Sequence, residues 1–305
     1  MKKNNLKGSL ILCTASLIWG FAFVAQSGAA KLIPSYTFNA LRSFIGAIVL
    51  YLFLRVKGRK EKTFFFPKCK ADRNKYFIAA VICGILLTAS VNFQQVGLAL
   101  YPDGVASEAR GGFITALYVV LVPLISIFAE KKINLFVWLS TLIAIAGIYL
   151  LCLSGGINGI YIGDILIFCC SVCFTVHILA IDKYVNFVGG IKLSVMQFVV
   201  CGVISSVMAA IFENPSINNV IAAAPQILYL GIFSSGIAYT LQIVGQRYAE
   251  PAVASLSMSL ESVFAALGGW IISGNSLTLR EICGCTLVFF AIVAAQTPEL
   301  LKKKA

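Results

Sequence analysis

The chain carries little charge and almost no histidine. Only 12% of its 305 residues are Asp, Glu, Lys or Arg, about half the share of a soluble domain, whereas 59% are hydrophobic. A soluble core could not bury this much apolar surface, so lipid must solvate a large part of it. A single histidine excludes a multi-histidine metal site. Cys169, Cys170 and Cys173 lie inside an apolar segment and have no partner Cys/His pair at zinc spacing, so we interpret them as packing residues. We therefore expect neither a metal nor another cofactor.

Signatures of catalysis and of nucleotide binding are also missing. There is no GxxxxGK[ST] loop, which argues against an ATPase module. An integral-membrane enzyme acting on lipid would need a polar catalytic cluster near one membrane face, and the sequence shows none. The net charge of +12 could suggest nucleic acid, but most of the excess lies in residues 55–75, which contain no recognisable nucleic-acid module. The sequence therefore favours neither an enzyme nor a nucleic-acid-binding protein.

Long apolar segments dominate the chain. About 20 mainly apolar residues cross a bilayer as a helix. Segments that meet this length are 9–28, 36–55, 77–99, 105–127, 135–153, 163–181, 193–212, 226–246, 252–273 and 281–297. The first is too long for the apolar part of a secretory signal, so we interpret it as an uncleaved helix. The sequence thus predicts an all-α integral membrane protein with ten transmembrane helices.

The distribution of Lys and Arg predicts the orientation of these helices. If the N-terminus is cytoplasmic, 20 of the 24 Lys and Arg residues lie in cytoplasmic segments and only Lys31 and Arg280 lie outside. The other two, Arg42 and Arg110, fall within predicted helices. Because basic residues are enriched on the cytoplasmic side, we expect a multi-pass protein of the cytoplasmic membrane with both termini in the cytoplasm.

The two halves of the chain resemble each other weakly. Residues 8–24 align with 163–179, and Val96-Gly97 aligns with Val244-Gly245. Ten helices divide into two units of five, 1–154 and 155–305, and an odd number of spans per unit inverts the second unit in the membrane. Inverted repeats are typical of transporters that alternate access to a site near the membrane midplane.

The chain also resembles the EamA-like family of the drug/metabolite transporter superfamily. The most specific match is GFITALYVVLVP at residues 112–123, followed by Glu130-Lys131-Lys132. Further matches are LIWGF at 17–21, Arg42, Gly163-Asp164 and LESVFAAL at 260–267. The family usually has Glu-Pro where this chain has Glu261-Ser262. The resemblance implies two EamA-like five-helix repeats, a central cavity, and export or exchange of small organic metabolites such as amino-acid-like compounds.

Polar and aromatic residues inside the predicted helices are candidates for a substrate cavity, because polar groups in hydrocarbon are costly and often functional. The candidates are Trp19, Arg42, Asn92, Gln95, Glu108, Arg110, His177, Tyr239, Gln242 and Glu261. Each also has a structural explanation. Arg42 could bind a substrate carboxylate or backbone carbonyls, and Glu261 could bind substrate or a proton or could fix its helix. His177 could titrate or pack as a neutral ring, while Glu108 and Arg110 could line the cavity or an outer gate, or extend to the interface.

Two polar stripes recur at helical spacing, one in each half. They are Thr88, Asn92 and Gln95, and Ser235, Tyr239, Gln242 and Gln246. Such stripes either line water or hold helices together, and we expect these two to face a shared cavity.

The sequence as a whole predicts a secondary transporter with a small-molecule substrate, embedded in the lipid bilayer. A lipid-modifying membrane enzyme, a pore and a scaffold are the alternatives, and a homodimer is left open. Substrate, coupling ion and direction of transport do not follow from the residues.

Overall fold

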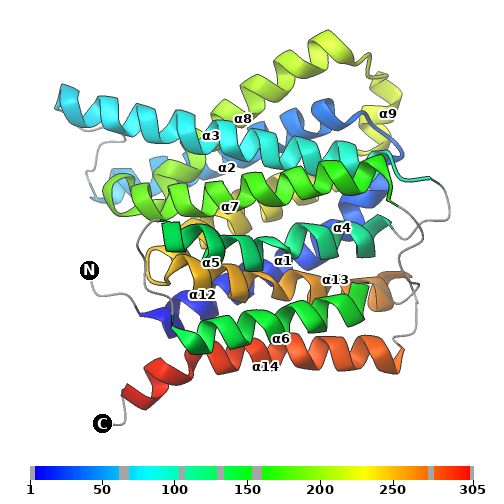
Figure 1. Cartoon of the computed structure of the whole chain (residues 1–305). Helices are drawn as coiled ribbons and strands as arrows, with labels where there is room; N and C mark the ends of the chain where they lie inside the picture. The colour runs from blue at the N-terminus through cyan, green and yellow to red at the C-terminus, as the bar shows by residue number, and fades with distance from the viewer. Residues whose placement is uncertain are drawn as a thin grey trace.

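A computed structural model describes residues 4–61, 69–102, 107–128, 134–152, 160–273 and 278–302. These residues are almost entirely helical, and the helices lie side by side in one bundle (Figure 1). The elements of the first half are α1 (Asn5–Ala30), α2 (Ser35–Glu61), α3 (Lys70–Ala99), α4 (Ser107–Ala116), α5 (Tyr118–Phe128) and α6 (Leu135–Cys152). Those of the second half are α7 (Ile162–Val188), α8 (Gly190–Phe212), α9 (Ile217–Ala222), α10 (Ala224–Tyr229), η1 (Leu230–Ala238), α11 (Tyr239–Gln246), α12 (Pro251–Met258), α13 (Leu260–Ser273) and α14 (Leu279–Lys302).

Eight helical stretches in the described part are long and apolar enough to cross a membrane. They are α1, α2, α3, α4–α5, α7, α8, α10–η1–α11 and α12–α13. This confirms the all-α membrane architecture expected from hydropathy. The two other predicted segments, 135–153 and 281–297, coincide with α6 and α14, which pack against each other. The apolar part of α6, Leu135–Leu150, is shorter than the eight.

Three of the long stretches are interrupted, which the sequence did not predict. The first interruption is a turn at Leu117 between α4 and α5, and Pro123 lies further along in α5. The second is a turn at Ser259 between α12 and α13. There the hydroxyls of Ser257 and Ser259 donate to the carbonyls of Val253 and Leu256 at 2.9 and 2.7 Å. Such bonds compete with the backbone ladder and bend helices.

The third interruption is the π-helix η1, whose wider turns shift the faces of its residues. Gly46 of α2 packs directly against this segment, because a Cβ atom added to Gly46 would lie 2.7 Å from the Ser235 Cβ. π-helical turns are rare and occur frequently at functional sites.

Two glycine pairs bring helices into backbone contact. A Cβ on Gly163 of α7 would lie 2.7 Å from the carbonyl oxygen of Gly97 on α3. A Cβ on Gly245 of α11 would lie 3.2 Å from the carbonyl oxygen of Gly8 on α1. A larger side chain at either crossing would force the helices apart, so glycine is required there.

The bundle has two distinct ends. In Figure 1, α1 begins and α14 ends at the left end, where α3 also begins. The short helix α9 lies at the right end. The N-terminus of α2 is held by α8: Glu213 accepts hydrogen bonds from the backbone N–H groups of Tyr36 and Thr37, each at 2.8 Å.

Candidate functional site

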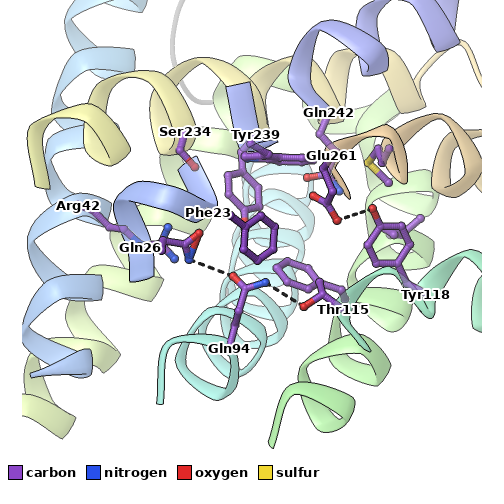
Figure 2. Close-up of a pocket in the computed structure, with 14 residues that line it drawn as sticks. Phe23, Gln26, Arg42, Gln94, Thr115, Tyr118, Ser234, Tyr239, Gln242 and Glu261 are labelled. Atoms are coloured by element: carbon purple, nitrogen blue, oxygen red, sulfur yellow. Dashed lines mark hydrogen bonds between the residues drawn. The ribbon is translucent and has the colours of Figure 1, made fainter. Parts of the chain in front are cut away.

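A cavity lies in the interior of the bundle, where side chains from both halves of the chain converge (Figure 2). Its lining residues are Trp19, Phe23, Gln26, Arg42, Gln94, Thr115, Tyr118, Phe174, Ile178, Ser234, Tyr239, Gln242, Met258 and Glu261. The cavity volume is about 40 Å³, which is room for a few water molecules. The arrangement combines one cation, one carboxyl group and several aromatic rings.

Arg42 supplies the positive charge. Its residue surface is only 3% exposed, and its Nε donates to Asn39 Oδ1 at 2.8 Å. The Asn39 amide is held in turn by Asn92 Oδ1 at 2.7 Å and by the Val91 carbonyl at 3.0 Å. Among the described residues, Arg42 forms no ion pair. The α2–α3 contact therefore orients a buried guanidinium without neutralising it.

Glu261 supplies the carboxyl group. It is 5% exposed and accepts a hydrogen bond from the Tyr118 hydroxyl at 2.8 Å. The turn at Ser259 places Glu261 in the first turn of α13. Free N–H groups and the helix dipole favour a negative charge at this position. Figure 2 shows Glu261 and Arg42 on either side of the Phe23 and Tyr239 rings.

Aromatic rings and two unpartnered polar atoms complete the cavity. The rings of Trp19 and Tyr239 meet edge to face with centroids 4.9 Å apart. The Phe198 ring also packs edge to face on Tyr239, with centroids 5.4 Å apart. The buried Trp19 Nε1 and Gln242 Oε1 have no hydrogen-bond partner among the described residues. A bound molecule could therefore accept a hydrogen bond from Trp19 and donate one to Gln242.

A chain of side-chain amides crosses one side of the cavity. Gln26 Nε2 of α1 donates to Gln94 Oε1 of α3 at 3.1 Å, and Gln94 Nε2 donates to Thr115 Oγ1 of α4 at 3.2 Å (Figure 2). The neighbouring Gln95 donates to the backbone carbonyl of Gln26 at 3.2 Å. This chain joins three helices of the first half through polar contacts.

The structure separates the ten candidates chosen from the sequence. Those that line the cavity are Trp19, Arg42, Tyr239, Gln242 and Glu261. Three others are buried in contacts between helices: Asn92 donates to Ser205 at 3.1 Å, Gln95 contacts Gln26, and His177 Nε2 lies 3.0 Å from Gln197 Oε1. Arg110 belongs to an ion pair away from the cavity, and the side chain of Glu108 lies outside the described part of the chain.

Several lining residues were missed by the sequence reasoning. Gln94 rather than Gln95 lines the cavity, and Ser234 rather than Ser235 does so in the other stripe. The π-helix accounts for the second shift, because its hydrogen bonds span five residues rather than four: the Tyr239 backbone N–H donates to the Ser234 carbonyl. Tyr118 stands inside the motif at 112–123, but nothing in its spacing marked it as a partner of Glu261.

A second polar cluster lies between α4 and α7, outside the cavity. Asp164 accepts hydrogen bonds from Arg110 Nε at 3.1 Å, Arg110 Nη2 at 2.6 Å, the Tyr101 hydroxyl at 2.6 Å and the Tyr161 backbone N–H at 2.9 Å. The Arg110 guanidinium also lies 4.8 Å from the centroid of the Tyr161 ring. Burial and the Asp164 carboxylate raise the pKa of Tyr101, so its hydroxyl stays protonated and remains a donor.

A helical bundle with membrane-length helices and a central polar cavity has the architecture of a membrane transporter. The model of the EamA-like transporter family matches residues 6–153 and, a second time, residues 161–295. The chain therefore belongs to the EamA-like transporter family, as its motifs indicated.

Curated relatives have names of the same kind. An "Uncharacterized transporter" of Archaeoglobus fulgidus is 28% identical over 295 residues, covering 94% of this chain and 85% of the relative. "Uncharacterized transporter YoaV" of Bacillus subtilis is 20% identical and covers 93% and 94%. "Uncharacterized inner membrane transporter YedA" of Escherichia coli is 24% identical and covers 91% and 86%. A protein crystal structure superimposes with a TM-score of 0.77 at 20% identity, covering 95% of this chain and 96% of the other, which establishes a shared fold.

Proposed function

We propose that this protein is a secondary transporter that moves small organic metabolites across the cytoplasmic membrane by alternating access, with the cavity between Arg42 and Glu261 as its substrate site. The observation that carries the proposal is the buried Arg42, which lines the cavity without an ion pair among the described residues. A buried charge without a counter-charge is costly. A substrate anion bound in the cavity would offset that cost.

The other cavity groups favour an amino-acid-like substrate. A carboxylate would lie at Arg42, where a guanidinium offers paired donors. An ammonium group would lie at Glu261 or donate to Gln242 Oε1. The apolar part of the molecule would pack on the rings of Trp19 and Tyr239. A substrate with both charges would leave the occupied cavity close to electrically neutral.

Ten helices in two inverted repeats, 1–154 and 155–305, would provide the inward-open and outward-open conformations that alternating access needs. The pairing of helices supports this, because α1, α2 and α3 would correspond to α7, α8 and the η1–α11 segment. The contact of α3 with α7 then corresponds to that of α11 with α1, and the contact of α3 with α8 corresponds to that of η1 with α2. Exchanging the halves converts each pair into the other. The family match also falls into two segments, 6–153 and 161–295.

Individual residue contacts in the two halves correspond in the same way. A Cβ on Gly97 would meet Ile167 at 2.6 Å, and a Cβ on Gly245 would meet Leu12 at 2.7 Å. The alignment of residues 8–24 with 163–179 places Leu12 on Ile167. The helices α2 and α8, which would be exchanged with each other, run antiparallel, because Ser43 contacts Cys201 and the start of α2 contacts Glu213. A two-fold axis in the membrane plane requires this direction.

The small cavity supports a cycle with conformational opening. A volume of about 40 Å³ is below what an amino acid needs, so a substrate enters only if helices move apart. The asymmetric distribution of Lys and Arg supports cytoplasmic termini, and the resemblance to metabolite exporters supports export as the direction.

Counterflow in liposomes tests the proposed function. Liposomes containing purified protein are loaded with one unlabelled metabolite and given a trace of the labelled form outside. We expect saturable, transient accumulation for amino acids, and weaker accumulation for the corresponding amines and amides, which lack the carboxylate. Flux without saturation would indicate a pore, and no counterflow with any member of a broad amino-acid panel would contradict the proposal.

A further inference from the structure

Two glutamines line the cavity from positions that the sequence alignment makes equivalent. The match of Gly97 with Gly245 places Gln94 of α3 on Gln242 of α11. Both residues line the cavity, and they are similarly buried, with 6% and 2% of their surface exposed. The two halves of the chain therefore present the same polar group to the cavity, so the surroundings of the two amides can be compared directly.

Other lining residues fall into equivalent pairs as well. The alignment of residues 8–24 with 163–179 places Trp19 on Phe174 and Phe23 on Ile178. All four of these side chains line the cavity. The helices α1 and α7 thus turn the same face toward it, which supports the equivalence of the two glutamines.

The hydrogen bonding of the two amides differs. Gln94 Oε1 accepts from Gln26 Nε2 at 3.1 Å, and Gln94 Nε2 donates to Thr115 Oγ1 at 3.2 Å. Gln242 Oε1 is buried and has no hydrogen-bond partner among the described residues. Continued by two residues, the alignment places Gln26 on Ile181, which is apolar and fully buried. The donor that satisfies the amide oxygen in the first half therefore has no equivalent in the second.

The place of Gln242 in the cavity indicates which group could satisfy it. A buried acceptor without a donor is costly, and proteins keep few of them. Figure 2 shows Gln242 and Glu261 on the same side of the Tyr239 ring, with Arg42 on the other side. The part of the cavity away from the guanidinium thus holds two acceptors, a carboxyl group and an amide oxygen. An ammonium group carries several N–H donors and can bind both.

We propose that Gln242 is a specificity-determining residue whose Oε1 accepts an N–H of the substrate's ammonium group and so selects primary amines over fully N-methylated ones. This inference rests on the proposed function, because it takes the cavity as the site of an amino-acid-like substrate. The Glu261 carboxylate attracts a cation with or without N–H groups, and aromatic rings such as those of Trp19 and Tyr239 bind quaternary ammonium groups. A neutral amide oxygen needs a donor, and a site that would leave it unpaired rejects the analogue that lacks one.

Thermal stabilisation of the purified full-length protein by ligands tests the role of Gln242 without a transport assay. A ligand that binds only the folded state raises the unfolding temperature as its concentration rises. The standard amino acids are screened first. The most stabilising one is then titrated beside its N,N,N-trimethyl derivative, which keeps the carboxylate and the positive charge but has no N–H on its nitrogen.

Two variants are titrated in the same way. Gln242→Met keeps the approximate length of the side chain and removes the acceptor. Thr240→Val is the matched control, because Thr240 lies on the same helix and its buried hydroxyl oxygen also has no partner among the described residues, yet its side chain does not line the cavity.

We expect the amino acid to half-saturate the parent protein at a concentration about tenfold or more below that of the trimethyl derivative. Gln242→Met should weaken binding of the amino acid by about tenfold and leave binding of the derivative nearly unchanged, so that the preference is lost. Because methionine has similar bulk, steric exclusion of the methyl groups would not disappear in this variant. Thr240→Val should keep the preference of the parent protein.

The unfolding temperatures without ligand give a second readout. Gln242→Met removes an acceptor that has no protein donor, so its unfolding temperature should stay the same or rise. Gln94→Met, at the equivalent position, breaks the hydrogen bonds to Gln26 and Thr115 and should unfold at a lower temperature. A decrease in Gln242→Met as large as that in Gln94→Met would make Gln242 a structural residue and overturn the inference.

The same preference for the amino acid in the parent protein and in Gln242→Met would also overturn the inference, as would a parent protein that binds both ligands equally. Binding with the expected preference but without counterflow in liposomes would contradict only the proposed transport. Counterflow of amino acids with an unchanged preference in Gln242→Met would contradict only the role of Gln242. Stabilisation by none of the amino acids would contradict both.

Discussion

The Tyr118 hydroxyl lies 2.8 Å from a carboxylate oxygen of Glu261, across the contact between α5 and α13. Each residue stands next to a break in its helix, Tyr118 directly after the turn at Leu117 and Glu261 two residues after the turn at Ser259. The breaks thus bring a donor and a carboxyl group together at the cavity wall. A helix interior has no free backbone N–H groups, so a continuous α12–α13 helix would give Glu261 less support.

The first prediction concerns the proton occupancy of this carboxyl group. Glu261→Gln keeps the shape of the side chain and its ability to accept from Tyr118, so we expect normal expression and folding. If Glu261 exchanges a proton or an ammonium group during transport, the variant should lose the pH dependence of uptake. The measurement is liposome uptake of a transported substrate from pH 5 to 8 for both proteins. Superimposable pH profiles would leave Glu261 with a structural role, and Tyr118→Phe serves as a control that removes the donor while keeping the carboxyl group.

The second prediction concerns Arg42. Arg42→Gln removes the cavity's positive charge and should reduce uptake of carboxylate-bearing substrates by about tenfold or more, since a bond to a charged group contributes about 1.5–3 kcal/mol. Arg42→Lys should recover part of the activity, because the charge returns without the planar guanidinium. Leu52→Ala, on the lipid-facing side of the same helix, is the matched control and should transport normally. Uptake by Arg42→Gln at the parent rate would show that the substrate does not bind through a carboxylate at this position.

The sequence predicted helices more successfully than the side chains that meet between them. Membrane-length apolar segments are a property of local composition, so their positions follow from hydropathy alone. Cavity lining depends on rotation about each helix axis. In α3 the sequence pointed to Gln95, whereas the adjacent Gln94 lines the cavity.

Departures from ideal helix geometry explain further differences. A 3.6-residue period cannot place residues across the π-helix η1, so Ser234 rather than Ser235 lines the cavity. The pairing of Arg110 with Asp164 could not be predicted either, because the two residues lie 54 positions apart and only the packing of α4 on α7 joins them. Arg42 and Glu261 were found because a charged residue in an apolar helix is conspicuous in any register.

The third prediction concerns the glycine crossing of α3 with α7. A Cβ on Gly163 would lie 2.7 Å from the Gly97 carbonyl oxygen, and the helix backbone there cannot yield without moving. We expect Gly163→Val to lower stability by about 1–3 kcal/mol, as overpacking does in close-packed interiors. Thermal unfolding in detergent measures the effect. Gly112→Ala is the matched control, because an added Cβ at Gly112 has no neighbour within 4 Å and should leave stability unchanged or slightly raised.

The last prediction concerns orientation in the membrane. Cys69 is exposed directly before α3, at the end of the bundle where α1 begins, whereas Ser216 is exposed directly before α9 at the opposite end (Figure 1). With 20 of 24 Lys and Arg residues assigned to the first end, we expect that end to face the cytoplasm. In a background without other reactive cysteines, an impermeant maleimide added to intact cells should label Ser216→Cys strongly and leave Cys69 unlabelled. Permeabilised cells, in which both sites react, provide the control for accessibility. Strong labelling of Cys69 in intact cells would mean that the basic end faces outward. The charge distribution would then have no topological role, and export along the proposed path would run from the other end of the bundle.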